Sequence, residues 1–566
     1  MRRDFTVCLL LLSLLTLTSC HRHRHDDKMI FRYNESAGIT TLDPAFAKDQ
    51  ALTWACRQLY NGLVQLDSTL QVQPCIAKRW SISSDGRTYT FTLRKDVYFH
   101  TNVLFPTPDN TRRVTADDFV YSFSRLTDPE VASPGAWFFR DVEHFKAPDD
   151  TTFVIQLREP FAPFLSQLGM VYCSVVPREV TEHYGKDFRN HPCGTGPFRF
   201  QYWKEGVKLV LRKNPLYFEY DTIWRVKESK SRKEEKTSAS QPPSHSVTLS
   251  LSDSVTPQIY RLPYLDAVAV TFIIDKQTVF LEFVKGNLDF MNSLDASYKD
   301  EILNPDGSLK EKYADRIDMV STPFLNTEYL GFNMEEKDNP LRDRRLRQAI
   351  SCGFDRGKMM QYLRNNIGAP GTGGFIPKGL PGYSDCGYKY DPERARKLLE
   401  EVKKERGELP KLKLSTTANY LDLCKYIQQQ LGLLGLDIQV DVNPPAALSE
   451  QVAQGKCQWF RKSWVADYPD AENYLMLFYG PNRTPAGPNY TRFNNKQADM
   501  LYKRMRTETD ADRRLQLYRE MDSLIMQEAP VMVLYYDQIL HFTHKNVHGL
   551  RSDAMNTLDL RRVIKN

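Results

Sequence analysis

Short segments in which apolar and polar residues alternate recur along the chain, and this period of two predicts strands. They include residues 88–93, 207–211 and 436–440. Segments with apolar residues at helical spacing lie between them, and in one of these Asp391 is placed as the N-cap with Pro392 at the first helical position. The alternation of the two kinds of segment predicts an α/β fold.

One stretch predicts how the strands are connected. A strand over residues 412–414, a helix over 421–434 and a strand over 436–442 follow one another, with Gly435 ending the helix. This order is that of a βαβ crossover, which joins parallel strands. We therefore expect a parallel or mixed sheet with helices on its faces.

Length and composition set the class of protein. The chain has 566 residues, enough for several domains or lobes with cores. Apolar residues make up 41% and charged residues 26%, the balance of a soluble globular protein. The net charge of +6 is small for this length and gives no reason to expect a nucleic acid as partner. After residue 20 no apolar run approaches the ~20 residues of a membrane-spanning helix.

The amino terminus has the form of an export signal. Two arginines precede an apolar core from Phe5 to Leu17, and small residues and Cys20 follow it. This ending resembles the bacterial lipobox, in which a lipid is attached to the cysteine and cleavage leaves it as the first residue. The alternative is an ordinary signal peptide with a chance cysteine. We predict a signal peptide over 1–19, lipid attachment at Cys20 and a solvated tether over 20–28, which anchors the protein on the extracytoplasmic side of a bacterial membrane.

The remaining cysteines leave the disulfides open. Of ten cysteines, Cys8 lies in the signal and Cys20 carries the lipid, which leaves eight. None of these forms a C-x-x-C pair or a zinc spacing. An exported chain with eight cysteines can form up to four disulfides, and buried free thiols are the alternative.

Residues 227–254 break the pattern of strands and helices. They are rich in Lys, Glu, Ser and Pro, with almost no aromatic or large aliphatic residue before Val247. A segment of this composition cannot bury enough apolar surface to offset the entropy lost on ordering. We predict a flexible surface insertion, and a docking tail for a partner is the alternative.

Catalytic signatures are absent from the sequence. We find no G-x-S-x-G, H-E-x-x-H, Walker or G-x-G-x-x-G motif. Gly194-Thr195-Gly196-Pro197 lacks most of a nucleotide fingerprint, and we interpret it as a tight crossover whose glycines take unusual dihedrals. We therefore predict that the protein is not an enzyme and has no catalytic residue, metal site or cofactor.

Seven blocks of sequence carry a resemblance to a known family. Their order and residue types are similar to those of the family 5 extracellular solute-binding proteins, the dipeptide and oligopeptide receptors of bacterial ABC importers. The blocks are residues 77–123, 194–198, 263–266, 329–356, 376–383, 464–470 and 529–531. The resemblance covers about residues 30 to 545. The chain departs from the family in a longer segment between His100 and Val114 and in the insertion over 227–254.

The resemblance implies an α/β, two-lobed periplasmic-binding-protein fold of class II, the Venus-flytrap type, with an extra subdomain. It divides the chain into a first lobe over 29–55, 192–322 and 535–566, which carries the insertion, a subdomain over 56–191 packed on it, and a second lobe over 323–534. Several chain crossings between the lobes form a hinge, and closure buries the ligand between them. We expect a monomer.

A candidate ligand site follows from the residues after 460. Ser463, Trp464 and Val465 form a short strand segment, and Asp467 stands just past it in a turn. A carboxylate beside a strand edge and an indole can hold a ligand ammonium while the backbone pairs with an extended peptide. The alternative for Asp467 is a turn cap, because Asp is favourable in turns.

The resemblance assigns roles to these positions. It implies that Asp467 binds the α-amino group of a peptide and that the backbone of residues 463–465 flanks the peptide main chain. The backbone of Gly38, Ile39 and Thr40 is expected on the same main chain. These seven residues are the predicted ligand site.

Other charged residues near these blocks have simpler interpretations. Asp470 and Glu472 are expected in a turn and in solvent. Arg345, Arg347 and Arg356 could pair with a ligand carboxylate, but such arginines more often form structural ion pairs.

Together these observations predict a membrane-anchored substrate-binding protein that captures di- or oligopeptides between two lobes and delivers them to an ABC permease. The same fold could bind a nickel complex, haem or a sugar instead. From other classes, an exported peptide or glycan hydrolase would turn its ligand over, and a structural or adhesive surface lipoprotein would lack an interlobe cleft.

Overall fold

The computed structural model describes residues 29–226, 255–293 and 299–566. The predicted signal peptide, the lipid on Cys20, the tether and the insertion over 227–254 lie outside these residues. Within the described ranges, no helix has both the length and the apolar character needed to cross a membrane.

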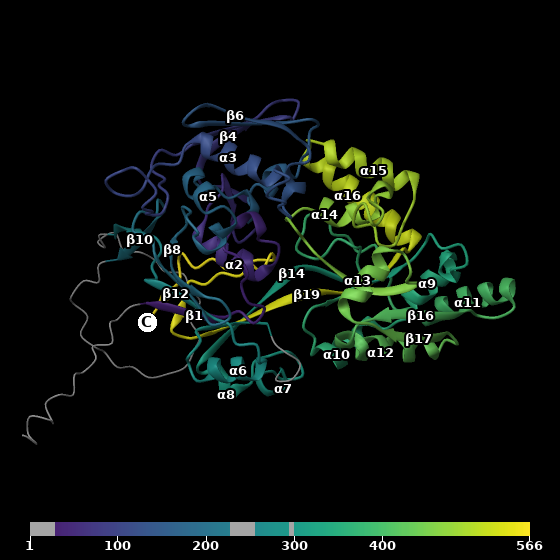
Figure 1. Ribbon diagram of the computed structural model, residues 1–566. Coiled ribbons are helices and arrows are strands. Elements are labelled where there is room, and N and C mark those ends of the chain that lie inside the picture. Colours follow the sequence, from purple (N-terminus) through teal and green to yellow (C-terminus); the bar gives the residue numbers. More distant parts are fainter. Residues whose placement is uncertain (1–28, 227–254, 294–298) are drawn as a thin grey trace, which may run out of the picture.

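One mixed sheet of eleven strands runs through the molecule, and two long antiparallel strands, β14 (Ile317–Phe332) and β19 (Val531–His544), lie at its centre. The sheet order is β17-β16-β18-β14-β19-β13-β1-β12-β9-β8, and β15 pairs with β19. The other strands are β1 (Ile30–Asn34), β8 (Phe198–Lys204), β9 (Lys208–Lys213), β12 (Ala267–Thr271), β13 (Phe290–Asn292), β15 (Ala369–Pro370), β16 (Lys411–Thr416), β17 (Asp437–Val442) and β18 (Trp459–Val465). Figure 1 shows β14 and β19 crossing from one half of the molecule to the other.

The buried residues form two large cores, one in each half. The first unites residues from Phe31 to Phe290 with those from Val547 to Val563. The second is built within residues 325–536. We call the two halves the first and second lobes. The predicted two-lobed α/β fold is therefore confirmed.

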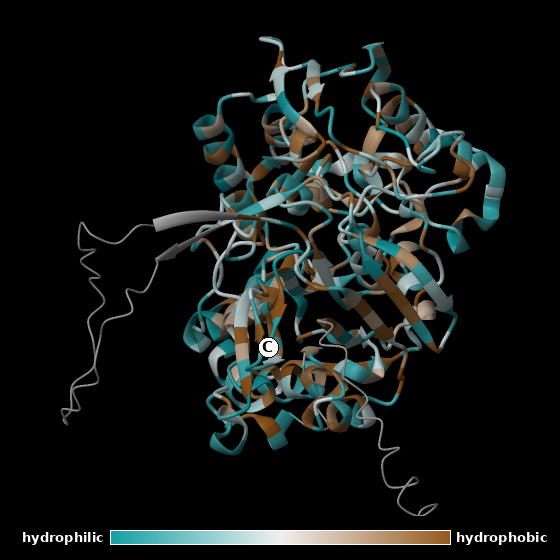
Figure 2. Cartoon of the chain, turned by 90° about the vertical axis from the view of Figure 1, so that its left-hand side faces the viewer, coloured by the Kyte–Doolittle hydropathy of each residue, from teal (hydrophilic) through white to brown (hydrophobic). Residues whose placement is uncertain are grey.

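The two central strands connect the lobes. The register of β14 against β19 shifts between Pro323 and Thr327, where β14 enters the second core at Leu325. A small third core, which includes Phe283 and Phe542, packs under the first lobe against the helices between β12 and β14. In Figure 2 hydrophobic residues concentrate on strands inside the molecule and hydrophilic residues on outer helices. The exact domain boundaries stay a prediction, and the one at 55/56 falls inside a continuous helix over 50–59.

Helices and smaller sheets complete the lobes. The helices are α2 (Gln50–Leu59), α3 (Ala116–Thr127), α4 (Phe164–Gln167), α5 (Arg178–Tyr184), α6 (Lys276–Val284), α7 (Lys299–Ile302), α8 (Glu311–Ala314), α9 (Arg344–Cys352), α10 (Arg356–Arg364), α11 (Pro392–Arg406), α12 (Leu421–Gly432), α13 (Pro445–Ala453), α14 (Glu472–Leu475), α15 (Lys496–Thr507) and α16 (Ala511–Glu528). A four-stranded sheet has the order β4 (Ala77–Ile82), β5 (Thr88–Leu93), β7 (Thr152–Leu157) and β6 (Val142–Asp149). Two-stranded ribbons are β2 (Val64–Leu66) with β3 (Val72–Pro74), β10 (Tyr220–Val226) with β11 (Val255–Arg261), and β20 (Val547–His548) with β21 (Ile564–Lys565).

The elements predicted from local pattern are present. Strand β5 has the predicted bounds, and α11 begins at Pro392 with the Asp391 side chain accepting from the Arg394 N–H at 2.9 Å. The predicted crossover is also confirmed, since β16 and β17 are parallel, with Leu412 opposite Ile438, and α12 connects them.

The segment around Gly194 differs from its prediction. Neither Gly194 nor Gly196 has a positive φ, so the prediction that these glycines take unusual dihedrals is wrong. The glycines are needed because the segment lies against the end of α2. A Cβ on Gly194 would lie 2.1 Å from the Leu59 carbonyl oxygen, and one on Gly196 2.4 Å from the Leu59 carbonyl carbon.

Of the two alternatives for the cysteines, disulfides or free thiols, the structure shows free thiols. All eight cysteines of the described residues are free thiols, and seven of them are buried. Burial raises the pKa of these thiols, for example that of Cys424 to about 11, so they stay protonated at neutral pH.

Candidate functional site

Strand β18 has an open edge over its second half. It pairs with β14 along its whole length, but the parallel strand β16 pairs with it only at Trp459 and Phe460. Along residues 461–465, no strand of the described chain covers the edge away from β14. Val465 is accordingly 46% exposed.

The backbone groups on this edge can be assigned from the ladder. The Ala466 N–H donates to the Leu325 carbonyl at 2.9 Å, on the β14 side. Because hydrogen-bonded pairs alternate along an antiparallel ladder, Trp464 also bonds toward β14, whereas Ser463 and Val465 direct their N–H and C=O groups to the open edge. An extended chain can pair with these groups.

Asn473 on α14 fixes the residues at the end of the edge. Its Oδ1 accepts from the Trp464 Nε1–H at 2.9 Å and from the Asp467 N–H at 3.0 Å. Its Nδ2 donates to Asp467 Oδ2 at 3.1 Å. Asn473 is fully buried, so the carboxylate and the indole are held in one orientation. The sequence interpretation missed Asn473; its position six residues after Asp467, in a helical turn, was the available signal.

Asp467 is a poorly compensated acid. Burial raises the pKa of its carboxyl, and within the described chain the one opposing contribution is the hydrogen bond from Asn473. Its field reaches Tyr172 of the first lobe and helps burial to raise the pKa of that hydroxyl. Asp467 therefore lies near the first lobe, and a cation placed beside it would lower its pKa.

The predicted first-lobe residues lie in the loop after β1. Gly38 has a φ of +75° and donates from its N–H to the Glu35 carbonyl at 3.2 Å, while Ile39 is buried and Thr40 is exposed. The loop follows the carboxyl end of a strand with parallel neighbours, where α/β sheets bind ligands. The charge of Asp49 contributes to the raised pKa of both the Glu35 carboxyl and the Tyr172 hydroxyl, so both groups lie near Asp49 in the first lobe.

The lobes touch beside this site. The rings of Trp137 and Tyr468 lie 6.3 Å apart between centroids. Arg506 on α15 forms an ion pair with Asp141 at 2.7 Å, and its carbonyl accepts from the Ala162 N–H at 3.2 Å. The structure is therefore one in which the lobes meet across the turn that carries Asp467.

Of two acids expected in solvent, Glu472 is buried and Asp470 is half-buried. Glu472 is 1% exposed and accepts hydrogen bonds from the hydroxyls of Tyr468 and Tyr502. Asp470 accepts from the Tyr518 hydroxyl at 2.6 Å. Burial raises the pKa of both carboxyls. Asp470 lies in a turn as predicted. The prediction of solvent exposure was wrong for Glu472, because its second partner, Tyr502, comes from α15, which the local sequence does not reveal.

The three arginines considered for a ligand carboxylate have structural partners. Arg345 binds both oxygens of Asp343, at 3.1 and 2.9 Å, as an ion pair. Arg347 donates to the Ala529 carbonyl at 2.9 Å, and Arg356 donates to the Ser351 carbonyl at 2.8 Å. The prediction of a structural role is confirmed, although Arg347 and Arg356 bind carbonyls.

Two cations at the other end of the open edge were not predicted. Arg461 forms an ion pair with the buried Glu328 and lies over the Tyr420 ring, and its Nε has no partner among the described residues. Lys462 Nζ lies 4.0 Å from the centre of the Tyr490 ring, and burial lowers the pKa of this lysine. The edge therefore has an acid at one end and cations at the other.

The described residues contain no group of three or more His, Cys, Asp or Glu side chains placed to hold a metal ion.

Comparison with known proteins identifies a family whose model matches this chain, relatives of similar sequence and solved structures of similar fold. Residues 71–486 match the model of a family described as bacterial extracellular solute-binding proteins, family 5 Middle. The dipeptide-binding protein of Escherichia coli is 24% identical over 522 residues, which cover 88% of this chain and 87% of that protein.

Solved structures share the fold. The periplasmic binding protein DppA of Helicobacter pylori, in complex with the peptide STSA, has a TM-score of 0.72 at 22% identity and covers 95% of this chain and 98% of its own. NikZ of Campylobacter jejuni, in complex with Ni(L-His), has a TM-score of 0.67 at 19% identity and covers 95% and 97%. At these identities the likeness shows the fold, and the two complexes hold different ligands.

Proposed function

Because the chain belongs to family 5 of the bacterial extracellular solute-binding proteins, we propose that it captures a peptide between its two lobes and delivers it to the permease of an ABC importer. The observation that carries the peptide assignment is the open edge of β18 with Asp467 at its end. An extended main chain pairs with such an edge, and a free amino terminus matches the carboxylate.

The proposal assigns a task to each part of the site. Asp467 holds the peptide ammonium, Asn473 orients the carboxylate, and Ser463 and Val465 bond the peptide main chain from the second lobe. The backbone of residues 38–40 contacts the peptide from the first lobe. Because recognition is through backbone and terminus, side-chain specificity is broad, with water filling the side-chain pockets.

Two further parts of the proposal concern location. A lipid on Cys20 holds the protein on its membrane, since several acyl chains, each contributing ~0.8 kcal/mol per buried CH₂, make a lasting anchor. The anchored protein then meets the permease by diffusing in the plane of the membrane. It binds its peptide as a monomer and releases the peptide unchanged.

Native mass spectrometry of the protein purified from its own host tests the ligand class. We expect bound species whose masses and fragments are those of peptides with free amino termini. Retention of a nickel complex, haem or a sugar in their place would contradict the proposal, and release of cleaved peptide on incubation would indicate a hydrolase.

A further inference from the structure

Lys462 is a cation beside the proposed peptide site that forms no ion pair with a carboxylate of the described chain. It lies on β18 two residues before Trp464, so both side chains project from one face of the strand. Its ammonium lies 4.0 Å from the centre of the Tyr490 ring. The ammonium has no hydrogen bond to a described residue and is not one of their fully buried polar atoms, so it retains surface that a ligand can reach.

Tyr490 connects this lysine with Asp467. The charge of Asp467 helps burial to raise the pKa of the Tyr490 hydroxyl, so the ring that Lys462 contacts also lies near the carboxylate. Burial and the charge of Arg461 lower the pKa of Lys462, and Asp467 does not act on it. The two opposite charges therefore lie on either side of Tyr490 without forming an ion pair, and each can bind a separate group of one ligand.

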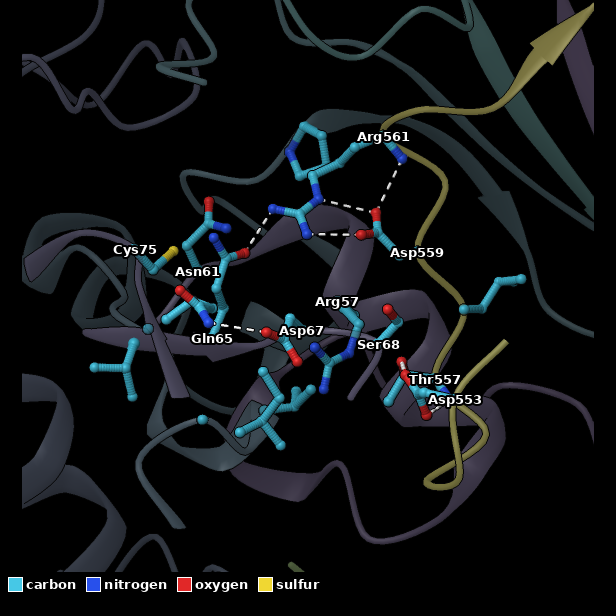
Figure 3. A pocket seen from close by; sticks show the side chains of 18 of the residues that line it. Arg57, Asn61, Gln65, Asp67, Ser68, Cys75, Asp553, Thr557, Asp559 and Arg561 are labelled. Atoms are coloured by element: carbon cyan, nitrogen blue, oxygen red, sulfur yellow. Dashed lines mark hydrogen bonds and ion pairs between the residues drawn. The ribbon is translucent and has the colours of Figure 1, made fainter. Parts of the chain in front are cut away.

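Comparable cations have their carboxylate partners within the protein. Arg461, the neighbour of Lys462, pairs with the buried Glu328. In the first-lobe cavity of Figure 3, Arg561 pairs with Asp559 at 2.6 Å. Lys462 differs, because burial lowers its pKa and no anion of the described chain acts in the opposite direction. A carboxylate brought by a ligand would stabilise the charged lysine.

The strand register says which carboxylate reaches Lys462. Asp467 follows the end of β18, so a peptide that binds Asp467 by its ammonium and pairs with the open edge runs antiparallel to the strand. With its first residue opposite Val465, its third lies opposite Ser463 and its fourth opposite Lys462. A dipeptide ends opposite Trp464, two residues or about 7 Å short of the level of Lys462.

We propose that Lys462 binds the terminal carboxylate of the captured peptide and that the site selects peptides of three or four residues, an inference that rests on the proposed function. Asp467 and Lys462 then hold the two charged ends of the ligand, and the edge of β18 pairs with the main chain between them. The distance between the two charges sets the length of the peptide.

Isothermal titration calorimetry with the full chain tests the proposal. The probes are alanine peptides of two to five residues with free amino termini, each as the free acid and as the C-terminal amide. The acids of three and four residues should bind the wild type roughly tenfold or more tightly than their amides, because only the acid forms a charge-assisted pair with Lys462. The preference for the acid should be small at two residues and should fall again at five.

Variants of Lys462 identify the partner of the carboxylate. Lys462→Met should bind the tripeptide acid about as weakly as the amide, while its affinity for the amide stays within about twofold of the wild type. Lys462→Arg keeps the charge and should keep the preference for the acid. Lys404→Met, which changes an exposed lysine on α11, is the matched control and should bind both peptides as the wild type does.

The outcomes that overturn the proposal do not depend on the folding of one variant. Equal affinity of the wild type for tripeptide acid and amide would overturn it, as would a preference for the acid that is greatest at two residues. A preference that persists in Lys462→Met would show that another group holds the carboxylate. A structural contact of Lys462 with Tyr490 would change the affinity for acid and amide alike.

A last arm separates this proposal from the proposed function. Asp467→Asn should weaken the tripeptide acid and its amide by the same factor, because both carry the ammonium. Binding that depends on Asp467 but shows no preference for the acid would overturn the role of Lys462 and leave the proposed function intact. Binding of no peptide, acid or amide, would overturn both.

Discussion

At the scale of single residues, the site depends on one buried amide. Asn473 holds Asp467 by two hydrogen bonds and Trp464 by a third. A carboxylate that is already held in one orientation loses little entropy when it binds, and such preorganisation contributes directly to affinity.

Replacement of Asn473 tests this role. We expect Asn473→Ala to weaken peptide binding roughly tenfold, because each lost hydrogen bond contributes about 1 kcal/mol to the orientation of the site. Isothermal titration calorimetry measures the change. Asn494→Ala, at an exposed position of the same lobe, is the control and should bind as the wild type does. Unchanged affinity in Asn473→Ala would show that orientation of Asp467 by the amide is dispensable.

Asp522 gives a pH-dependent prediction. It is fully buried on α16, and its Oδ1 accepts from the Phe375 N–H at 2.7 Å while its Oδ2 has no partner among the described residues. Burial raises the pKa of this carboxyl to about 7. The native state therefore binds the proton more tightly than the unfolded chain, so its contribution to stability is present below the unfolded pKa, near 4, and is lost as the pH rises to 7.

Asp522→Asn should remove this dependence. Between pH 4 and pH 7 the difference in unfolding free energy between Asp522→Asn and the wild type should grow in favour of the variant by about 1.4 kcal/mol per pH unit. Denaturant titrations at several pH values measure it. A difference that is flat over this range would contradict the assignment of a raised pKa to Asp522.

At the scale of elements, the open half of β18 is the feature that fits a peptide. Only every second residue of β18 directs its backbone N–H and C=O groups to β14. The N–H of Val465 points the other way, so it can bind a ligand without breaking a hydrogen bond of the sheet. Proline is tolerated at such positions, where the missing N–H faces away from the ladder.

Val465→Pro separates ligand pairing from sheet stability. It should leave the melting temperature within a few degrees of the wild type and weaken peptide binding about fivefold, because one main-chain hydrogen bond worth about 1 kcal/mol is lost. Calorimetry and thermal unfolding on the same preparation measure both effects. Full affinity in a folded Val465→Pro variant would argue that the peptide does not pair with this edge.

Local sequence pattern predicts individual strands and helices, whereas the open edge and the burial of Glu472 depend on contacts between residues distant in sequence. The periodicity of residues 88–93 and the cap at Asp391 act within a few residues, and both predictions are confirmed. The strand before Asp467 was predicted, but its open edge arises because β16, more than forty residues away in sequence, pairs with only two of its residues. The burial of Glu472 likewise depends on Tyr502 from another helix.

At the scale of the whole molecule, two strands carry the connection between the lobes. Each of β14 and β19 is continuous from the small third core under the first lobe into the second core, so the second lobe can move relative to the first by a change near Pro323 without unfolding either large core. The family resemblance predicted the two lobes because the seven blocks span the chain.

The proposed anchor is tested on the intact precursor in a bacterial host. Cys20→Ser removes the thiol that accepts the lipid, so the variant should lose lipid labelling and accumulate as unprocessed precursor. Metabolic labelling with a fatty acid and a gel shift measure these effects, with Cys8→Ser as the control that keeps both labelling and processing. Normal labelling of Cys20→Ser would contradict the anchor.

The central claim is that Asp467 holds the α-amino group of a bound peptide, and one calorimetric cycle tests it most directly. A peptide and its N-acetylated form are titrated into the wild type and into Asp467→Asn. Loss of one member of a buried charge pair costs ~2–5 kcal/mol, so the free peptide should bind Asp467→Asn roughly thirtyfold or more weakly than the wild type. The acetylated peptide should bind the wild type poorly and lose much less in the variant. Equal affinity of the wild type for the two peptides would contradict the account.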